Sequence, residues 1–223
     1  MKHLSRILST LCLFFLSSCV LFDTFQREYS ATSTTFWVVD EETMAPIPGA
    51  IVTANWELVM GSLAGGPVVQ GQMWIMETES DEKGKAFLPA WGPEPNRHGG
   101  HIRDADPQMF VYRAGYQPVR LDNFNRFMQS PKPGTPYGFS LDSLRHSLWD
   151  GETIKLSKAT NKKYAYLNTS LDGVAAGLDF ALGGGSCDWK LLPKMTIVLL
   201  DAHLVHRENL REDRCGALDD RAR

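Results

Sequence analysis

Short segments of alternating polar and apolar residues, separated by glycine, proline and aspartate, are the feature that most constrains the fold of this 223-residue chain. The clearest segment is 50–58, in which Ala50, Val52, Ala54, Trp56 and Leu58 alternate with mostly polar residues. A period of two with one apolar face is typical of a half-buried β-strand. Similar short segments occur at 35–40, 72–78, 85–88, 109–113 and 119–121. The pattern predicts a mainly β protein built as an antiparallel sandwich, not alternating β–α–β units.

Three motifs carry a resemblance to a known family. They are Val-Val-Asp at 38–40, Pro-Ile-Pro-Gly-Ala-Ile-Val at 46–52, and Thr-Glu-Ser-Asp-Glu-Lys-Gly-Lys-Ala-Phe at 78–87. Together they resemble the carboxypeptidase regulatory-like domain, with Ser80 and Met44 standing where threonine and glycine are usual. The resemblance implies a seven-stranded transthyretin-like (prealbumin-like) sandwich over residues 34–125. These motifs mark a fold and not an active site.

Beyond the sandwich, the apolar period changes. Residues 126–158 are weakly patterned and are interpreted as a connecting segment. Apolar residues then recur at spacings of three and four within 159–210, which predicts two amphipathic helices that pack on each other and on the sandwich. Pro193 suits the first turn of the second helix, which is expected to run to about His206. Residues 211–223 are predicted to be a charged tail.

The first residues indicate a secretory leader. Lys2 and Arg6 precede a ten-residue apolar run at 7–16, which is too short for a membrane-spanning helix. The following Leu-Ser-Ser-Cys at 16–19 resembles the lipobox of bacterial lipoproteins. The resemblance implies cleavage after residue 18, diacylglycerol on Cys19 and, from Val20, sorting to the outer membrane. An ordinary signal peptide or a short membrane anchor is the alternative. Residues 19–33 are interpreted as a lipidated tether.

The remaining cysteines suggest a cross-link. Cys12 would leave with the leader and Cys19 would carry lipid, so Cys187 and Cys215 remain in the folded chain. The cell envelope is an oxidising compartment in which disulfides persist. The two cysteines flank the second predicted helix, and the segments beside it are long enough to fold back across its length. A Cys187–Cys215 disulfide is therefore expected.

The charge balance argues against a nucleic-acid partner. The whole chain has 23 basic and 26 acidic residues, a net charge of −3. The predicted leader holds two of the basic residues and no acidic one, so its removal makes the net charge −5. Proteins that bind nucleic acid usually carry a basic excess.

One loop could hold a divalent metal ion, because imidazoles and carboxylates lie close together in it: His98, His101, Asp104 and Asp106. Arg97 and Arg103 lie among them and disfavour a cation. The spacing matches none of the usual zinc patterns, so a solvated loop is the favoured interpretation and no metal or other cofactor is expected.

Two further features bear on possible binding sites. His203 and His206 are three residues apart on the predicted second helix, where a polar helix edge is favoured over a ligand pair. Trp91 stands beside a Gly-Pro step and is expected to be exposed, which would suit a glycan-stacking site. Trp37 and Trp56 fall on patterned strands and are expected in the core.

The sequence contains fold motifs but no recognisable catalytic constellation. There is no nucleophile elbow and no phosphate-binding glycine motif. We therefore expect a non-catalytic, lipid-anchored protein of the bacterial envelope that acts as a binding, scaffolding or assembly module. Its expected partners are the membrane, through Cys19, and an envelope protein or glycan. The alternatives are a metal-dependent envelope enzyme using the loop from His98 to Asp106, and a glycan-binding module.

Overall fold

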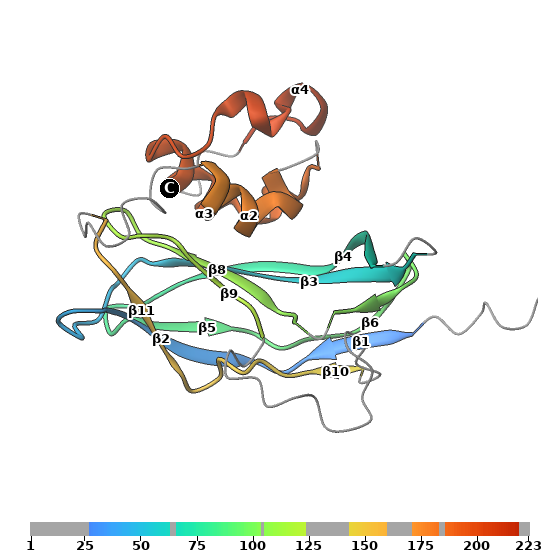
Figure 1. The fold of residues 1–223 in the computed structure, drawn as a ribbon, viewed down its shortest axis with the longest axis horizontal. Coiled ribbons are helices and arrows are strands. Elements are labelled where there is room, and N and C mark those ends of the chain that lie inside the picture. The colour runs from blue at the N-terminus through green and yellow to red at the C-terminus, as the bar shows by residue number, and fades with distance from the viewer. Residues whose placement is uncertain are drawn as a thin grey trace, which may run out of the picture.

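The protein consists of two β-sheet layers and a helical extension that covers one of them (Figure 1). This computed structural model describes residues 27–62, 66–103, 105–123, 143–159, 171–182 and 186–218. Within that part of the chain, no helix has the length and apolar character needed to cross a bilayer. The mainly β sandwich with a C-terminal helical part, predicted from the sequence, is confirmed.

The upper layer in Figure 1 is one antiparallel sheet. Its strands lie in the order β4 (Pro67–Glu79), β3 (Ile51–Gly61), β8 (Gln108–Tyr112) and β9 (Val119–Leu121), and β7 (His101–Ile102) also pairs with β3. Strand β3 contains all but the first residue of the alternating segment 50–58. Its inward residues Val52, Ala54, Trp56 and Leu58 are all buried in the core between the layers.

The lower layer is formed by two three-stranded sheets that follow each other end to end. One is β11 (Thr153–Leu156), β2 (Thr34–Asp40) and β5 (Lys85–Leu88). The other is β10 (Leu144–Arg145), β1 (Glu28–Ala31) and β6 (Trp91–Pro95). Strands β10 and β11 run parallel to β1 and β2, whereas β5 and β6 run antiparallel to them.

The turn between β4 and β5 forms where the sequence motif places it, but the two strands do not pair as a hairpin would. Strand β5 pairs with β2, so this turn carries the chain from the upper layer to the lower one. The side-chain Oδ1 of Asp81 accepts hydrogen bonds from the backbone N–H groups of Lys83 and Lys85, at 2.9 and 2.8 Å. Gly84 adopts φ +70°, and a Cβ atom there would lie 2.4 Å from the carbonyl oxygen of Val38. This position therefore requires glycine for both its backbone conformation and the close approach of β2.

The layer boundaries differ from the sequence-based division in two places. Strand β1 lies inside the expected tether 19–33, and β10 and β11 lie inside the expected connecting segment 126–158. These strands are short and complete the lower layer only by pairing with distant partners, so local periodicity could not reveal them. The described sandwich accordingly has eleven strands and exceeds the seven of the transthyretin-like pattern.

Two tryptophan predictions were wrong. Trp91 is buried because β6 pairs with β1 and turns the indole inward, where it stacks on Trp74 at 5.3 Å and meets Trp56 edge-on at 5.2 Å. Trp37 is exposed because its neighbours Phe36 and Val38 occupy the inward positions of β2. The burial predicted for Trp56 is confirmed.

The helical extension lies over the outer face of the upper layer (Figure 1). It contains α2 (Leu171–Leu182), the 3₁₀ helix η2 (Asp188–Leu191), α3 (Pro193–Asp201), the 3₁₀ helix η3 (Arg207–Leu210) and α4 (Glu212–Cys215). A second core joins it to the sheet, with Ile51, Phe110 and Tyr112 on one side and Leu178, Trp189, Leu192 and Met195 on the other. The helices therefore pack on each other and on the sandwich, as the sequence indicates.

The last part of the extension differs from the prediction in two ways. Helix α3 is shorter than expected, and the segment after it is more folded than expected. Helix α3 ends at Asp201 and not near His206, and His203 lies beyond it with φ 55°. The expected charged tail contains α4, and Leu218 is buried against the extension. Apolar anchors such as Leu218 are too sparse in this segment to give a helical period.

Helix α2 approaches the sheet closely through a glycine. A Cβ atom at Gly177 would lie 2.3 Å from the ring of Phe110, which is buried on β8. The absence of a side chain at this position thus lets the α2 backbone rest on the aromatic ring.

Glu77 on β4 caps helix α3 from the sheet. Its carboxylate accepts the backbone N–H groups of Lys194 and Met195 at 2.9 and 3.0 Å. These groups belong to the first turn, where helix N–H groups lack partners within the helix and the helix dipole favours an anion. The capping residue Leu192 provides no side-chain bond of its own. Burial raises the pKa of Glu77, and the two backbone N–H groups act against that rise.

We predict that Glu77→Ala loosens the helical extension by about 2 kcal/mol, because two charge-assisted bonds are lost. Hydrogen exchange of the α3 amides should become about thirtyfold faster. The matched control is Glu79→Ala, which removes only the exposed ion pair between Glu79 and Lys194 and should cost less than about 1 kcal/mol. Equal effects of the two substitutions would contradict the capping role.

Candidate functional site

A polar cleft of about 580 Å³ lies between the outer face of the upper sheet and the helical extension. The sheet contributes mostly amide and charged side chains: Glu57, Gln70, Gln72, Arg103, Gln108 and Arg120. The extension contributes Asp179, Phe180, Ser186 and Asp188. A concave site of this size, between two structural units, is where small ligands are usually bound.

The cleft forms where the outer face of β3 changes from apolar to polar. Ile51 is covered by the extension, whereas Asn55 and Glu57, on the same side of the strand, are polar. Glu57 stands directly opposite Gln72 of β4, and Asn55 stands opposite Gln108 of β8. The strand thus brings amide and carboxylate groups from neighbouring strands to one surface.

Hydrogen bonds orient these groups in a chain. The amide nitrogen of Asn55 donates to the side-chain oxygen of Gln72 at 3.0 Å, and the amide nitrogen of Gln72 donates to Glu57 at 3.4 Å. Arg103 completes the chain through an ion pair with Glu57 at 3.0 Å. The floor of the cleft is therefore held in a defined arrangement of donors and acceptors.

Asp106 fixes Arg103 from beneath. One carboxylate oxygen accepts from the Arg103 guanidinium at 3.1 Å, and the other accepts the backbone N–H of Glu57 at 2.6 Å. The Asp106 side chain is completely buried. Loss of hydration raises its pKa to about 7, although the charge of Arg103 and the two hydrogen bonds oppose this rise. Asp106 is therefore a positioning residue for the cleft and does not itself face a ligand.

The charge of Arg120, at the other side of the cleft, is also compensated. Asp122 accepts from Gln108 at 3.1 Å and forms an ion pair with Arg120 at 3.3 Å. Each arginine of the cleft thus has a carboxylate partner within the described structure. The cleft consequently presents many hydrogen-bonding groups and no concentrated positive charge.

The loop from His98 to Asp106, the candidate metal site, does not form a shared set of metal ligands in the described residues. The backbone N–H of His98 binds Asn96, the His98 side chain is exposed, and His101 lies on β7 opposite Val59. The Asp106 carboxylate is directed inward and is already shared by Arg103 and Glu57, and Asp104 lies outside the described residues. No cluster of three or more histidine, cysteine, aspartate or glutamate side chains suited to a metal ion occurs in the described ranges.

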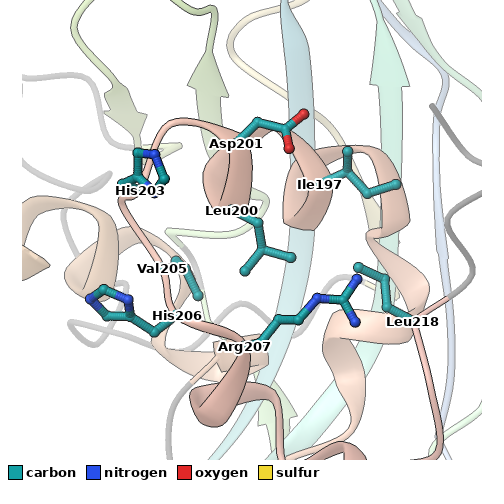
Figure 2. A pocket seen from close by; sticks show the side chains of 8 residues that line it. All are labelled: Ile197, Leu200, Asp201, His203, Val205, His206, Arg207 and Leu218. Atoms are coloured by element: carbon teal, nitrogen blue, oxygen red, sulfur yellow. The ribbon is translucent and has the colours of Figure 1, made fainter.

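His203 and His206 both line a smaller pocket of about 290 Å³ in the extension. Figure 2 shows the two imidazoles on one side of this pocket, with Arg207 and Leu218 on the other. Asp201, at the end of α3, also lines it. The predicted helix edge was wrong for these histidines, because the chain leaves the helix at Asp201.

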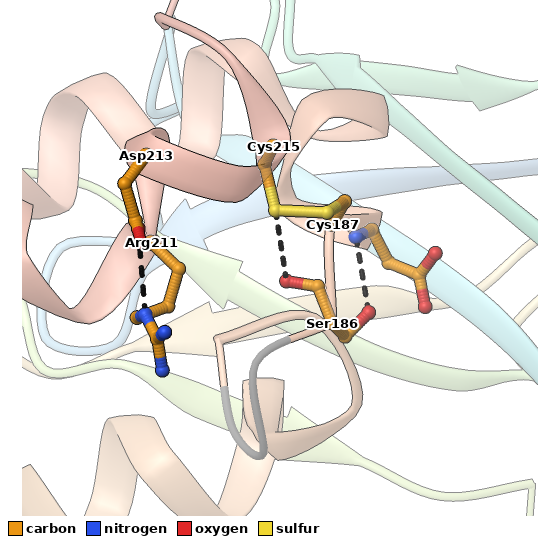
Figure 3. Close-up of a disulfide and its surroundings, with 6 residues drawn as sticks. Ser186, Cys187, Arg211, Asp213 and Cys215 are labelled. Carbon is orange, nitrogen blue, oxygen red and sulfur yellow. Dashed lines mark hydrogen bonds and ion pairs between the residues drawn. A yellow bond between two sulfur atoms is a disulfide. The ribbon is translucent and has the colours of Figure 1, made fainter.

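The structure contains the Cys187–Cys215 disulfide (Figure 3), and its Cα atoms are 5.4 Å apart. The chain returns across the extension through η3 and α4, which brings Cys215 back beside the segment that precedes η2. Cys19 lies outside the described residues.

Sequence reasoning missed the cleft itself. Its signal was present in β3, where Asn55 and Glu57 occupy the outward positions of an otherwise apolar strand. The pattern predicts a half-buried strand, but nothing local indicates that a later segment folds over its polar face.

The comparisons with known proteins give only distant similarity. No family model matches the chain, and no curated protein matches it. Among solved structures, similarity is found to the group B streptococcus pilus 2b backbone protein, with 11% identity, a TM-score of 0.28, and coverage of 58% of this chain and 42% of that one. The 3-chlorocatechol 1,2-dioxygenase of Rhodococcus opacus 1CP gives 14% identity, a TM-score of 0.31, and coverage of 60% and 62%.

A third similar structure is the dioxygenase domain of a dioxygenase and carbohydrate-binding protein fusion from Streptomyces sp. SirexAA-E. It has 16% identity, a TM-score of 0.29, and coverage of 61% of this chain and 84% of that domain. This chain spans less than two thirds of the length of the pilus protein and of the chlorocatechol dioxygenase. At these TM-scores the similarities carry no argument about function. The fold and the cleft define this protein as a β-sandwich module with a helical extension.

Proposed function

We propose that this protein is a non-catalytic binding module of the bacterial envelope, anchored by lipid at Cys19, whose cleft binds a neutral oligosaccharide that carries acetamido groups. The observation that carries the proposal is the row of oriented amides and compensated charges between the sheet and the extension.

The chemistry of the cleft fits such a ligand. Each glutamine amide offers both a donor and an acceptor, which matches hydroxyl and acetamido groups. Because Arg103 and Arg120 already have carboxylate partners, an anionic ligand would have to compete with Glu57, Asp106 and Asp122. Val69 and Phe180 add apolar surface to the same cleft, suited to an acetyl methyl group and the face of a sugar ring.

The proposed anchor rests on the sequence. The lipobox-like Leu-Ser-Ser-Cys places acyl chains on Cys19, and several chains hold a protein stably on a membrane. Val20 favours the outer membrane. Arg27 is only eight positions after Cys19, the start of the mature chain, so the module would work close to the bilayer surface.

A binding role without catalysis is supported by how three ionisable groups of the sheet side of the cleft are used. Glu57 and Arg103 hold each other, and Asp106 is sealed beneath them. A general base must reach a proton of its substrate. These three groups instead form ion pairs and hydrogen bonds with one another that hold the site in place.

We expect the purified mature chain to bind β-1,4-linked oligomers of N-acetylglucosamine in calorimetric titration, and to bind glucose oligomers of the same length more weakly. Gln70→Ala should weaken binding about three- to tenfold through loss of one exposed amide from the cleft. Asn209→Ala, an exposed amide on η3 outside the cleft, is the matched control and should leave affinity unchanged.

Failure of these oligomers to bind, or equal affinity of the Gln70→Ala variant, would contradict the assignment of the cleft. Stoichiometric zinc in the purified protein, lost on His98→Ala and His101→Ala, would favour the metal-dependent alternative instead. Mass spectrometry of the membrane-extracted protein tests the anchor separately, because acylation adds a defined mass to the peptide that begins at residue 19.

A further inference from the structure

The two sheet layers differ in how their outer faces are covered. The helical extension packs on the outer face of the upper sheet, whereas none of the described helices lies over the outer face of the lower layer (Figure 1). Large apolar side chains are exposed on or beside this lower layer: Trp37 (38% exposed), Phe87 (49%), Leu144 (47%) and Leu148 (56%). Exposed apolar patches of this kind mark interaction sites more often than scattered single residues do.

Strand register places Trp37 and Phe87 side by side and directs Leu144 to the same outer side of the adjoining sheet. Trp37 stands between Thr153 of β11 and Lys85 of β5, and Phe87 stands opposite Thr35, one step along the same face. Leu144 pairs with Ser30, whose neighbours Tyr29 and Ala31 point into the core, so Leu144 faces outward. Leu148 lies in the turn that leads into β11, where Asp150 accepts the backbone N–H of Thr35 at 2.8 Å.

Two lysines flank the aromatic pair. Lys85 lies directly beside Trp37, and Lys155 lies opposite Val39 on the same face. Neither lysine takes part in an ion pair within the described residues. The outward positions of β2, β5 and β11 carry no acidic side chain: Thr35, Trp37, Val39, Lys85, Phe87, Thr153 and Lys155.

Acidic residues border this face but do not occupy its centre. Asp81 and Asp150 lie in turns, where their carboxylates accept backbone N–H groups. Glu152 precedes β11, and Glu28 begins β1 at the other end of the layer. Glu41 and Glu42, both exposed, follow β2 at its end. The two lysines are therefore the charged residues at the aromatic centre of a face whose border is acidic.

We propose that the face formed by Trp37, Phe87, Leu144, Leu148, Lys85 and Lys155, here named the docking face, lies on an anionic lipid bilayer. This inference rests on the lipid anchor of the proposed function. Eight residues cannot extend more than about 28 Å, so an acylated Cys19 keeps Arg27 and the adjoining strand β1, which belongs to this layer, near the bilayer.

The composition of the docking face favours lipid over a second glycan surface. Tryptophan and phenylalanine suit the interfacial region of a bilayer, and lysine is attracted to anionic headgroups. Two leucines accompany the aromatic residues, and aliphatic side chains gain free energy among acyl chains, whereas sugar rings stack on aromatic faces. Docking would turn the opposite, helix-covered side of the molecule and its cleft away from the membrane.

The test uses the mature chain with Cys19→Ser, so that acylation cannot contribute. We expect it to co-float with vesicles of phosphatidylglycerol and phosphatidylcholine in equal parts, and much less with phosphatidylcholine alone or in high salt. Trp37 is the one tryptophan of the six with more than a third of its surface exposed, so its fluorescence should shift to the blue on binding.

Trp37→Ser combined with Phe87→Ser should lower the partition coefficient at least about tenfold. Lys85→Gln and Lys155→Gln should each lower it about fivefold on the anionic vesicles only. The matched control is Met60→Ser with Val68→Ser, which removes two exposed apolar side chains that face each other on the upper sheet and should leave binding unchanged. Circular dichroism and thermal unfolding verify that each variant is folded.

No binding of the unacylated chain to any vesicle would overturn the inference, as would equal binding by the docking-face and control variants. Binding to soluble acidic polysaccharide in place of vesicles would assign the face to a glycan and would also overturn it. Because acylation is measured separately by mass spectrometry, failure of the docking face and failure of the anchor can be told apart.

Discussion

Removal of the Cys187–Cys215 disulfide is expected to destabilise the helical extension by about 3 to 4 kcal/mol. The cross-link joins residues 28 apart, and a closed loop of that size restricts the unfolded chain by about this amount in the chain-entropy description. The loop contains η2, α3 and η3, whose helices are too short to be stable alone. The sandwich has its own core and should remain folded.

The measurement is hydrogen exchange in the protein with Cys187→Ser and Cys215→Ser. Amides of α3 should exchange more than a hundredfold faster, whereas those of β3 and β8 should change little. Reduction of the wild-type protein should reproduce the effect, and reduction of the double variant should add nothing. Equal acceleration in the helices and in the strands would show that the extension and the sandwich unfold as one unit.

The second large effect concerns Asp106 and depends on pH. Burial raises its pKa to about 7 in the folded protein, above the ordinary value of 3.8. Between these two values the folded state holds more protons than the unfolded state, so stability falls as the pH rises from about 4 to about 7. The contribution of this one group amounts to at most about 4 kcal/mol over that range.

Asp106→Asn removes the titration while it keeps the size of the side chain. We expect the stability of the wild type, relative to this variant, to decrease from pH 4 to pH 8, as measured by urea unfolding at a series of pH values. Taking the difference between the two proteins cancels the other titrating groups. The trend should persist in high salt, because screening acts mainly on exposed charges. A difference that is constant or increases with pH would show that Arg103 outweighs the burial of the carboxylate.

The fold was predictable to the extent that local pattern determines it. The alternation in β3 indicates a strand directly, and this strand pairs with β4, which follows it in the sequence. The Asp81–Gly84 motif indicates a turn, because its hydrogen bonds join residues that are near in sequence. The helical extension followed from its apolar spacing. Strands β10 and β11 could not be predicted in this way, since their four or fewer residues become strands only when β1 and β2 lie beside them.

The site was less predictable than the fold. Asp106 was grouped with His98 and His101 because they are close in sequence, yet the structure turns its carboxylate toward Glu57, a residue on a different strand. The cleft depends on Asp179, Ser186 and Asp188 meeting a sheet face formed a hundred residues earlier. The Gly-Pro step beside Trp91 likewise predicts an exposed side chain. The pairing of β6 with β1, which directs the indole inward, is not visible in the local sequence.

The parallel pairing in the lower layer has a consequence for folding of the chain during its synthesis. The bond between Thr35 and Asp150 spans 115 residues, so one edge of β2 has no partner until the second half of the protein has been synthesised. Contacts of such long range slow folding, and exposed strand edges invite association between chains. A product truncated before residue 144 would retain most of its hydrophobic core residues but lack the strands that close this edge. Nascent molecules are therefore most vulnerable to aggregation during the interval between synthesis of β2 and synthesis of β11.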